Sequence, residues 1–342
     1  MFKKIISLSL CLVFFALCGC SKADNTSSAV DSVPEVVVEE EKFAINPLTG
    51  VKNLDPAALN NRPVAIMVGN CTDGQKAQTG LNYADIIYET EVEDGITRLM
   101  AVYQDITKAD KVGSVRSARY PYIDLAMGHN AVYIHCGEGN TATAHLKDLD
   151  HISIDTKSVG AKRIPNGLPS WHTLYALTGD LWNNINSKFD TKSTDTTPWL
   201  NFYDEDETVT LTAGSATSIT VPFQANTTKF TYNAEKGVYT RLNKNGVAVA
   251  DYNTKESTEI ENVLVLLSKI TIHSNGKHRM VEFTQGDGYY FTNGTYTFIK
   301  WSKGDAENSF KFTDTEGNKL KVKAGKSWIC IGDKARSNPT IQ

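Results

Sequence analysis

The hydrophobic pattern of this 342-residue chain changes near residue 190, and this change constrains the fold more than any other sequence feature. From about residue 62 to 188, short apolar runs typical of strands alternate with windows of helical period. Beyond 190, short strand-like segments follow one another with turn residues between them. The first pattern is typical of α/β domains and the second of all-β domains. We therefore expect an α/β domain over residues 46–189 and an all-β domain over 190–342.

Strands and helices of the first domain can be placed approximately from these periods. The expected strands cover 63–68, 84–92, 96–104 and 131–135, and the expected helices cover 118–127, 141–149 and 174–185. The tight turn Glu93-Asp94-Gly95 indicates that the second and third strands pair antiparallel. The sequence thus predicts a mixed sheet with flanking helices.

Short strands separated by turns fill the second domain. Asn-Gly pairs at 245–246, 275–276 and 293–294 are typical of hairpin turns. The expected strands cover 208–212, 218–222, 229–232, 238–242, 263–273, 280–285, 288–291, 295–301, 310–314 and 320–323.

The first residues predict export and lipid attachment. Lys3 and Lys4 precede an apolar run over 5–17, which is typical of a signal peptide and short for a permanent membrane span. Leu17-Cys18-Gly19-Cys20 resembles the lipobox of bacterial lipoproteins, in which the cysteine is acylated before cleavage. We expect a signal peptide over 1–19, lipidation of Cys20 and a place on the outer face of the cell membrane. Ordinary secretion and an uncleaved anchor are the alternatives.

An acidic, Ser-rich segment without helical or strand period follows, over residues 20–45. A chain of this length reaches about 80 Å when fully extended. We therefore expect a tether that holds the folded part away from the bilayer.

Charge and cysteine spacing limit the classes of function. The chain has 35 basic and 39 acidic residues, so nothing indicates nucleic-acid binding and any anion site must be local. No Cys/His spacing typical of zinc occurs, and we expect neither a metal nor a cofactor. Cys71, Cys136 and Cys330 are expected to be buried thiols, with a disulfide between Cys71 and Cys136 as the alternative.

The stretch "VGSVRSARYPYIDLA" at 112–126 places two arginines where a strand-like run gives way to a helix-like one. If Ser117 caps the helix, Arg116 and Arg119 flank exposed backbone amides, and together these groups would bind a phosphate or carboxylate. The alternatives are ion pairs with carboxylates such as Asp85 or Glu89, and a Ser117 nucleophile. The expected ligand-binding residues are Arg98, Arg116, Ser117, Arg119, His135, Gly137 and His172.

His135 ends an expected strand, and Gly137 begins the turn that follows it. Backbone amides of such a turn can approach an anion, although a purely structural histidine is the alternative. His172 lies with Trp171 in a Pro- and Gly-containing loop, which could cover a polar or sugar-like ligand or could only pack on the core.

The densest acidic cluster supplies further candidates, Glu89 and Glu93. Residues 89, 91 and 93 share one face of an expected strand, where they could bind Mg²⁺ or Ca²⁺ or act as acid and base. A solvated strand face and an ion pair with Arg98 are the alternatives. Aromatic residues over 289–301 are expected to be core and cross-strand pairs, with a carbohydrate platform as the alternative.

Several motifs in fixed order together resemble one family. They are "NPLTG" at 46–50, "RPVAIMVGN" at 62–70, "GLNYADIIYETEVEDGITRLMAVYQ" at 80–104, "KVGSVRSARYPYIDLA" at 111–126, "YIHCG" at 133–137 and the closing "GTYTFIKWSKGDAENSFKFTDTEGNKLKVKAGKSWICI" at 294–331. In these motifs the chain is similar to the YerB-like lipoproteins of Gram-positive bacteria. The resemblance implies a lipoprotein with a separate C-terminal β domain and a function that is unknown. Gly69 and Thr173 stand where the family pattern has asparagine, so the resemblance assigns no amide role at either position.

These patterns favour a non-catalytic lipoprotein of the cell envelope, although the enzyme question stays open. We expect it to bind an anionic or glycan cell-wall ligand through an Arg/His cleft of the α/β domain. One alternative is an envelope enzyme that transfers or hydrolyses phosphoryl or glycosyl groups. The other is a scaffold that docks an envelope protein.

Overall fold

The computed structural model describes residues 43–342. The expected signal peptide over 1–19, the lipidation site Cys20 and the tether up to residue 42 lie outside the described residues. The last two residues assigned to the tether form a short strand, β1 (Ala44–Ile45), which pairs with β2 (Lys52–Leu54). Between residues 43 and 342, no helix has the length and apolar character needed to cross a bilayer.

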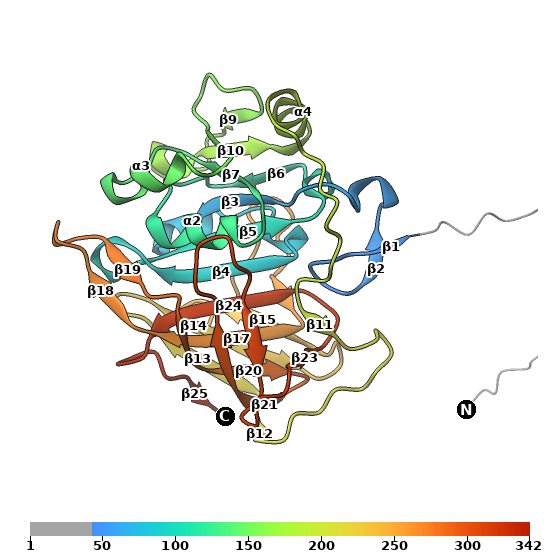
Figure 1. The fold of residues 1–342 in the computed structure, drawn as a ribbon. Coiled ribbons are helices and arrows are strands. Elements are labelled where there is room, and N and C mark those ends of the chain that lie inside the picture. The colour runs from blue at the N-terminus through green and yellow to red at the C-terminus, as the bar shows by residue number, and fades with distance from the viewer. Residues whose placement is uncertain (1–42) are drawn as a thin grey trace, which may run out of the picture. The chain divides into compact units, whose positions relative to one another are not determined.

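One eleven-stranded mixed sheet, here called the long sheet, organises these residues (Figure 1). Its strands, in spatial order, are β12 (Gly214–Ser215), β21 (Thr295–Ser302), β20 (Gln285–Thr292), β17 (Asn262–Ser268), β24 (Ser327–Asp333), β4 (Ile86–Glu91), β5 (Thr97–Tyr103), β3 (Val64–Gly69), β7 (Val132–His135) and β8 (His151–Ser153), with β22 (Lys311–Thr313) beside β21. Pairing of β4 with β5 is antiparallel and that of β3 with β7 is parallel, so the predicted mixed sheet is confirmed.

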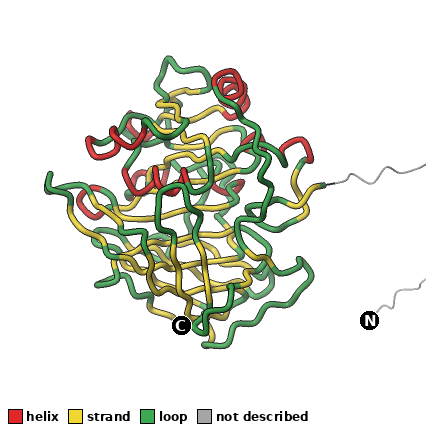
Figure 2. Tube along the Cα trace, viewed as in Figure 1, coloured by secondary structure: helices red, strands yellow, loops and turns green. Residues whose placement is uncertain are grey.

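The long sheet continues through both halves of the chain. β24 from the C-terminal half pairs in parallel with β4 from the N-terminal half, and Figure 1 shows the two strands side by side. Every helix of the described residues lies before residue 190, whereas strands are found on both sides of it. Figure 2 shows the helices gathered toward one end of the described fold. The described chain is thus mostly sheet with few helices, and the exact division into an α/β and an all-β domain stays a prediction.

Two apolar cores cover the two faces of the long sheet. One core includes α2 (Tyr120–Met127) and α3 (Asn140–Leu146), together with aromatic residues near the C-terminus. The other includes α4 (Thr178–Lys188) and two smaller sheets. These are β6 (Lys111–Gly113), β10 (Leu174–Leu177) and β9 (Ala161–Arg163), and β16 (Glu259–Ile260), β15 (Val238–Leu242), β14 (Thr227–Asn233), β13 (Ser218–Pro222) and β25 (Thr340–Ile341), here called the five-stranded sheet.

Smaller elements complete the chain. They are α1 (Thr72–Lys76), the pair β11 (Asn201–Phe202) and β23 (Lys321–Val322), and the pair β18 (Ile270–Ile272) and β19 (Arg279–Val281).

The expected helix over 174–185 is wrong in its first turn. Its first four residues form β10, which pairs with β6 and β9 on its two sides, and the helix begins only at Thr178. An apolar run of this length fits a buried strand and a buried helix equally well, and pairing on both sides decides for the strand. The structure also has no strand over residues 208–212, where one was expected. The next strand of the described chain, β12, covers Gly214–Ser215.

A buried polar network joins the long sheet to the five-stranded sheet. Glu89 is completely buried, and its Oε1 accepts hydrogen bonds from Asn70 at 2.8 Å, Thr97 at 2.8 Å and Thr228 at 2.7 Å. Its Oε2 accepts one from Trp328 Nε1 at 3.2 Å. Thr228 lies in β14, whereas the acceptor lies in β4, so this bond crosses between the sheets.

Arg241 supplies the positive charge of this network. It is fully buried in β15, its guanidinium lies 4.7 Å from the ring centre of Trp328, and it donates to Asn70 Oδ1 at 2.5 Å and Gln78 Oε1 at 2.9 Å. Asn70 therefore bridges Arg241 to Glu89. Buried charges are tolerated only where such partners replace the lost water.

We predict that Glu89→Ala lowers the free energy of unfolding by about 3–5 kcal/mol, because it leaves several buried donors unpaired and a buried cation uncompensated. Urea unfolding of the chain measures this change. Glu235→Ala, an exposed residue in the turn after β14, should stay within about 0.5 kcal/mol of wild type. Equal stabilities of the two variants would contradict the role of the network.

Candidate functional site

The predicted arginine segment lies at the end of two parallel strands. β3 and β7 run side by side, and residues 114–118 pass between their C-terminal ends. There the Gly69 amide donates to the Ser114 carbonyl at 3.0 Å, and the Cys136 amide donates to the Arg116 carbonyl at 2.9 Å. The C-terminal ends of parallel strands are common ligand sites in α/β sheets. The predicted residues thus gather at one edge, but in separate groups.

Arg98 and Arg119 form one group, and both are paired with Glu93. Arg119 donates to the two carboxylate oxygens of Glu93 at 2.6 and 2.7 Å, and Arg98 also forms an ion pair with it. Burial alone would raise the pKa of Glu93, but the hydrogen bond from Arg119 and the charges of both arginines outweigh it and hold this pKa at about 2. The ion-pair alternative therefore holds for Arg119, with Glu93 rather than Asp85 or Glu89 as its partner. The ion pair expected between the acidic cluster and Arg98 is also formed by Glu93.

Arg116 and His172 form a second group. Arg116 Nη1 donates to the Trp171 carbonyl at 2.6 Å, and within residues 43–342 no carboxylate lies within ion-pairing distance of its guanidinium. His172 is buried, whereas the neighbouring Trp171 side chain is 58% exposed. A Cβ added at Gly69 would lie 3.2 Å from Arg116 Cγ, so the glycine leaves room for this arginine.

The structure corrects the predicted role of Ser117. Helix α2 begins at Tyr120 with Arg119 as the residue before it, so Ser117 does not cap this helix. Its carbonyl instead accepts a hydrogen bond from Arg98 Nη1 at 2.7 Å. Pro121 is well placed in the first turn of a helix, where the missing amide costs nothing, and it favours this later start.

His135 is occupied by neighbours on its own sheet edge. Its Nδ1 lies 2.8 Å from the Gly137 carbonyl and its Nε2 lies 2.9 Å from His151 Nδ1. Burial lowers the pKa of His135 to about 4, so the ring is neutral at pH 7. Both ring nitrogens are used within the protein, which fits the structural alternative better than a ligand contact. Gly137 has a positive φ of 68° in an exposed turn, as its expected turn role requires.

The acidic candidates do not form a solvated strand face. Glu89 and Glu91 are both completely buried in β4, and only Glu93 reaches the surface. Among the residues that the structure describes, no group of three or more His, Cys, Asp or Glu side chains is placed to share a metal ion.

Cys71 and Cys136 are free thiols, separated by the Arg116 segment, so the alternative disulfide is wrong.

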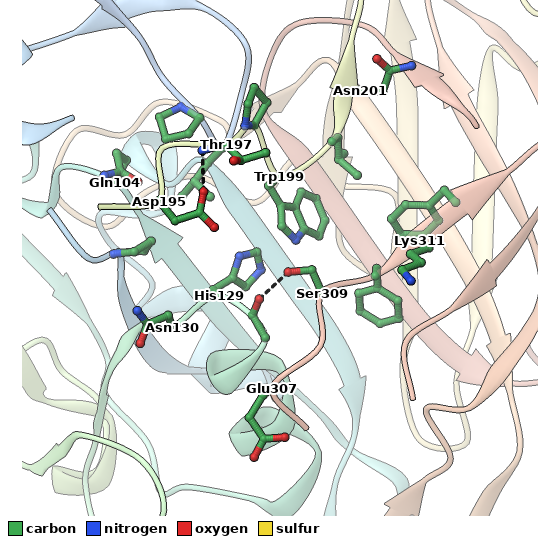
Figure 3. Close-up of a pocket in the computed structure, with 18 of the residues that line it drawn as sticks. Gln104, His129, Asn130, Asp195, Thr197, Trp199, Asn201, Glu307, Ser309 and Lys311 are labelled. Atoms are coloured by element: carbon green, nitrogen blue, oxygen red, sulfur yellow. Dashed lines mark hydrogen bonds between the residues drawn. The ribbon is translucent and has the colours of Figure 1, made fainter. Parts of the chain in front are cut away.

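A cavity of about 750 Å³, here called the aromatic pocket, lies away from this edge and was not predicted (Figure 3). It is lined by four separate segments, residues 47–48, 127–130, 193–201 and 307–320, together with residues near 61–63 and Gln104. Its apolar side chains include Trp199, Phe310 and Phe312. In the sequence, the only signal for this pocket was a tryptophan, Trp199, in a loop rich in Ser and Thr.

Aromatic rings form one wall of the pocket. Trp199 lies with its ring centre 5.0 Å from that of His129 and 6.3 Å from that of Phe312, and Phe310 stacks on Phe312 at 5.6 Å. His129 Nε2 is 2.8 Å from the Tyr88 hydroxyl. Burial lowers the pKa of His129 to about 3, so this ring is a neutral hydrogen-bonding group.

Polar groups with balanced charge surround the rings. Two hydrogen bonds fix the rim in Figure 3, from Ser309 Oγ to the Gly128 carbonyl at 2.7 Å and from the Thr197 amide to Asp195 Oδ1 at 2.9 Å. The charged lining residues are two acidic and two basic ones, Asp195, Glu307, Lys311 and Lys319. Since these charges cancel, the pocket suits a neutral ligand with one apolar and one polar side.

Comparison with known proteins gives a consistent relationship. Residues 48–194 match the model described as "Protein of unknown function (DUF3048) N-terminal domain", and residues 219–329 match that of its C-terminal domain. "Putative lipoprotein YerB" of Bacillus subtilis (strain 168) is 26% identical over 337 residues, covering 96% of this chain and 95% of the relative. The crystal structure of YerB protein from Bacillus subtilis matches with a TM-score of 0.73 at 25% identity, covering 86% of this chain and 98% of that chain.

We predict that the Glu93 ion pairs stabilise the fold only above the acidic range. Because the folded pKa of about 2 lies below the ordinary glutamate pKa of 4.5 in the unfolded chain, this stabilisation is present above pH 4.5 and is lost as the pH falls through 2. Urea midpoints of wild type and Glu93→Gln should therefore differ at pH 7 and converge between pH 4.5 and 2. A difference that stays constant over this range would contradict the ion-pair assignment.

Proposed function

The chain belongs to the YerB-like family of lipoproteins with DUF3048 domains, and from this premise we propose that it binds a neutral glycan of the cell envelope in the aromatic pocket. It would do so as a lipid-anchored protein on the outer face of the membrane, without covalent chemistry. The observation that carries the proposal is the pocket itself, which combines an aromatic wall with a polar rim of balanced charge.

A pyranose ring has the two kinds of surface that this pocket offers. Its C–H face is apolar and can stack on a flat aromatic ring, and the partly exposed Trp199 presents such a ring at one wall of the pocket. Its hydroxyl edge needs donors and acceptors, which the neutral His129 and the amides and hydroxyls of the rim can supply. A volume near 750 Å³ is typical of small-molecule pockets.

An anionic ligand is less well supported. Of the three arginines expected to hold it, two share the carboxylate of Glu93 as their ion-pair partner, and only Arg116 has a guanidinium without a carboxylate partner in the described chain. The aromatic pocket contributes no arginine, and its two lysines are balanced by two acidic residues. Among the two ligand classes expected from the sequence, the glycan is therefore the one we propose.

Trp199→Ala should weaken binding of N-acetylglucosamine oligosaccharides by about tenfold or more, because truncation removes the stacking surface at the pocket wall. Isothermal titration calorimetry of the full chain measures the dissociation constant. Trp199→Phe should retain most of the affinity, and Trp171→Ala is the matched control, since that tryptophan is exposed at the other site. Unchanged affinity in Trp199→Ala, or loss in Trp171→Ala, would contradict the proposed pocket.

The lipid anchor has its own test. Wild type should incorporate labelled palmitate and lose residues 1–19, whereas Cys20→Ser should incorporate no label and keep them, because acylation of the thiol precedes cleavage. Gel fluorography and the intact mass report both properties. Cys71→Ser is the control with one other thiol removed, and it should behave as wild type. Labelling that persists in Cys20→Ser would contradict the anchor.

A further inference from the structure

A thiol and an imidazole face each other at the end of β3. Cys71 follows this strand, and its Sγ lies 3.9 Å from Nε2 of His172, which comes from the loop between β9 and β10. The Cys71 side chain is partly exposed. The other two described cysteines are less suited to reaction as thiolates. Cys330 is completely buried, and burial raises the pKa of the half-buried Cys136.

The imidazole of His172 is neutral, and one of its ring nitrogens has no hydrogen-bond partner. It is 3% exposed, and its Nδ1 is buried without a hydrogen-bond partner, so its ring contacts a polar group only through the nitrogen that faces the thiol. Burial, and then the charge of Arg116, lower the pKa of His172, and the negative charge of Asp73 has a smaller opposing effect. The imidazole is therefore unprotonated at pH 7 and can accept a proton from a thiol.

The surroundings of this pair favour a small anionic reactant. The Arg116 guanidinium lies beside His172 without a carboxylate partner in the described chain, and Arg163 holds the Ser170 carbonyl of the same loop. Ser114 is completely buried with an unpartnered Oγ, which lies 3.4 Å from the position of a Cβ at Gly69. Unpartnered polar atoms and a free cation thus flank an accessible thiol.

We propose that Cys71 and His172 form a thiol–disulfide exchange site for small anionic disulfides. The Cys71 thiol gives its proton to His172 Nε2, and the thiolate attacks one sulfur of the bound disulfide. A new disulfide forms between Cys71 and that half of the reactant, while the original S–S bond breaks. The leaving thiolate takes the proton from the imidazolium and departs as a thiol, so no outside oxidant or reductant is needed. The aromatic pocket takes no part in this step.

The test follows the reaction of the full chain with 5,5′-dithiobis(2-nitrobenzoic acid), an anionic aromatic disulfide, with the modified cysteines assigned by peptide mass spectrometry. Cys71 should react first, and its rate at pH 7.5 should fall by about tenfold or more in His172→Gln, as expected when a general base is removed. Cys136→Ser is the matched control and should leave the Cys71 rate unchanged.

A second measurement needs no histidine variant, so a folding defect cannot obscure the result. The rate of wild-type Cys71 between pH 4 and 9 should show two ionisations, the lower one from His172, whereas Cys136 in a Cys71→Ser chain should show only that of its thiol. Arg116, Asp73 and Cys71 are the charged or titratable groups that face His172, and they are present throughout. A single ionisation at Cys71, or faster modification of Cys136, would overturn the proposal.

Discussion

The buried bonds between Glu89 and its neighbours are the interaction on which the rest of this structure depends. Glu89 lies at the centre of the long sheet, and its carboxylate is bound by side chains from β5, β14, β24 and the end of β3. Arg241 enters the same network from the five-stranded sheet through Asn70. Since a buried charge is costly without these partners, the network requires both sheets to be in place at once.

This constraint explains why the candidate sites are shared between distant segments. The aromatic pocket needs residues 127–130 from the first half of the chain and residues 307–320 from the second. The Cys71 and His172 pair needs the end of β3 and the loop before β10. The pocket needs the long sheet to run unbroken through the pairing of β4 with β24, whereas the Cys71 and His172 pair lies within the N-terminal half. Binding in the aromatic pocket is therefore a property of the joined halves.

Local sequence patterns predicted local structure well and long-range pairing poorly. Apolar patterns and turn residues predicted the positions of β3, β4, β5 and β7, because the burial of a strand is reflected in the apolar residues of its own sequence. No local pattern could reveal that β24 lies beside β4, some 240 residues away, or that four segments enclose one pocket. The ion pair of Arg98 was anticipated because Glu93 lies five residues before it across a tight turn. The burial of Glu89 was not predicted. The two-residue period of a strand shows which residues share a face, but it does not show whether water or another sheet covers that face.

The central claim is that the aromatic pocket holds a neutral glycan, and a crystal structure of the full chain soaked with an N-acetylglucosamine oligosaccharide tests it most directly. The account predicts a pyranose ring stacked on Trp199, with its hydroxyl groups bound by His129 and the polar rim. Sugar bound instead beside Arg116, or an empty pocket at a saturating concentration of the oligosaccharide, would contradict it.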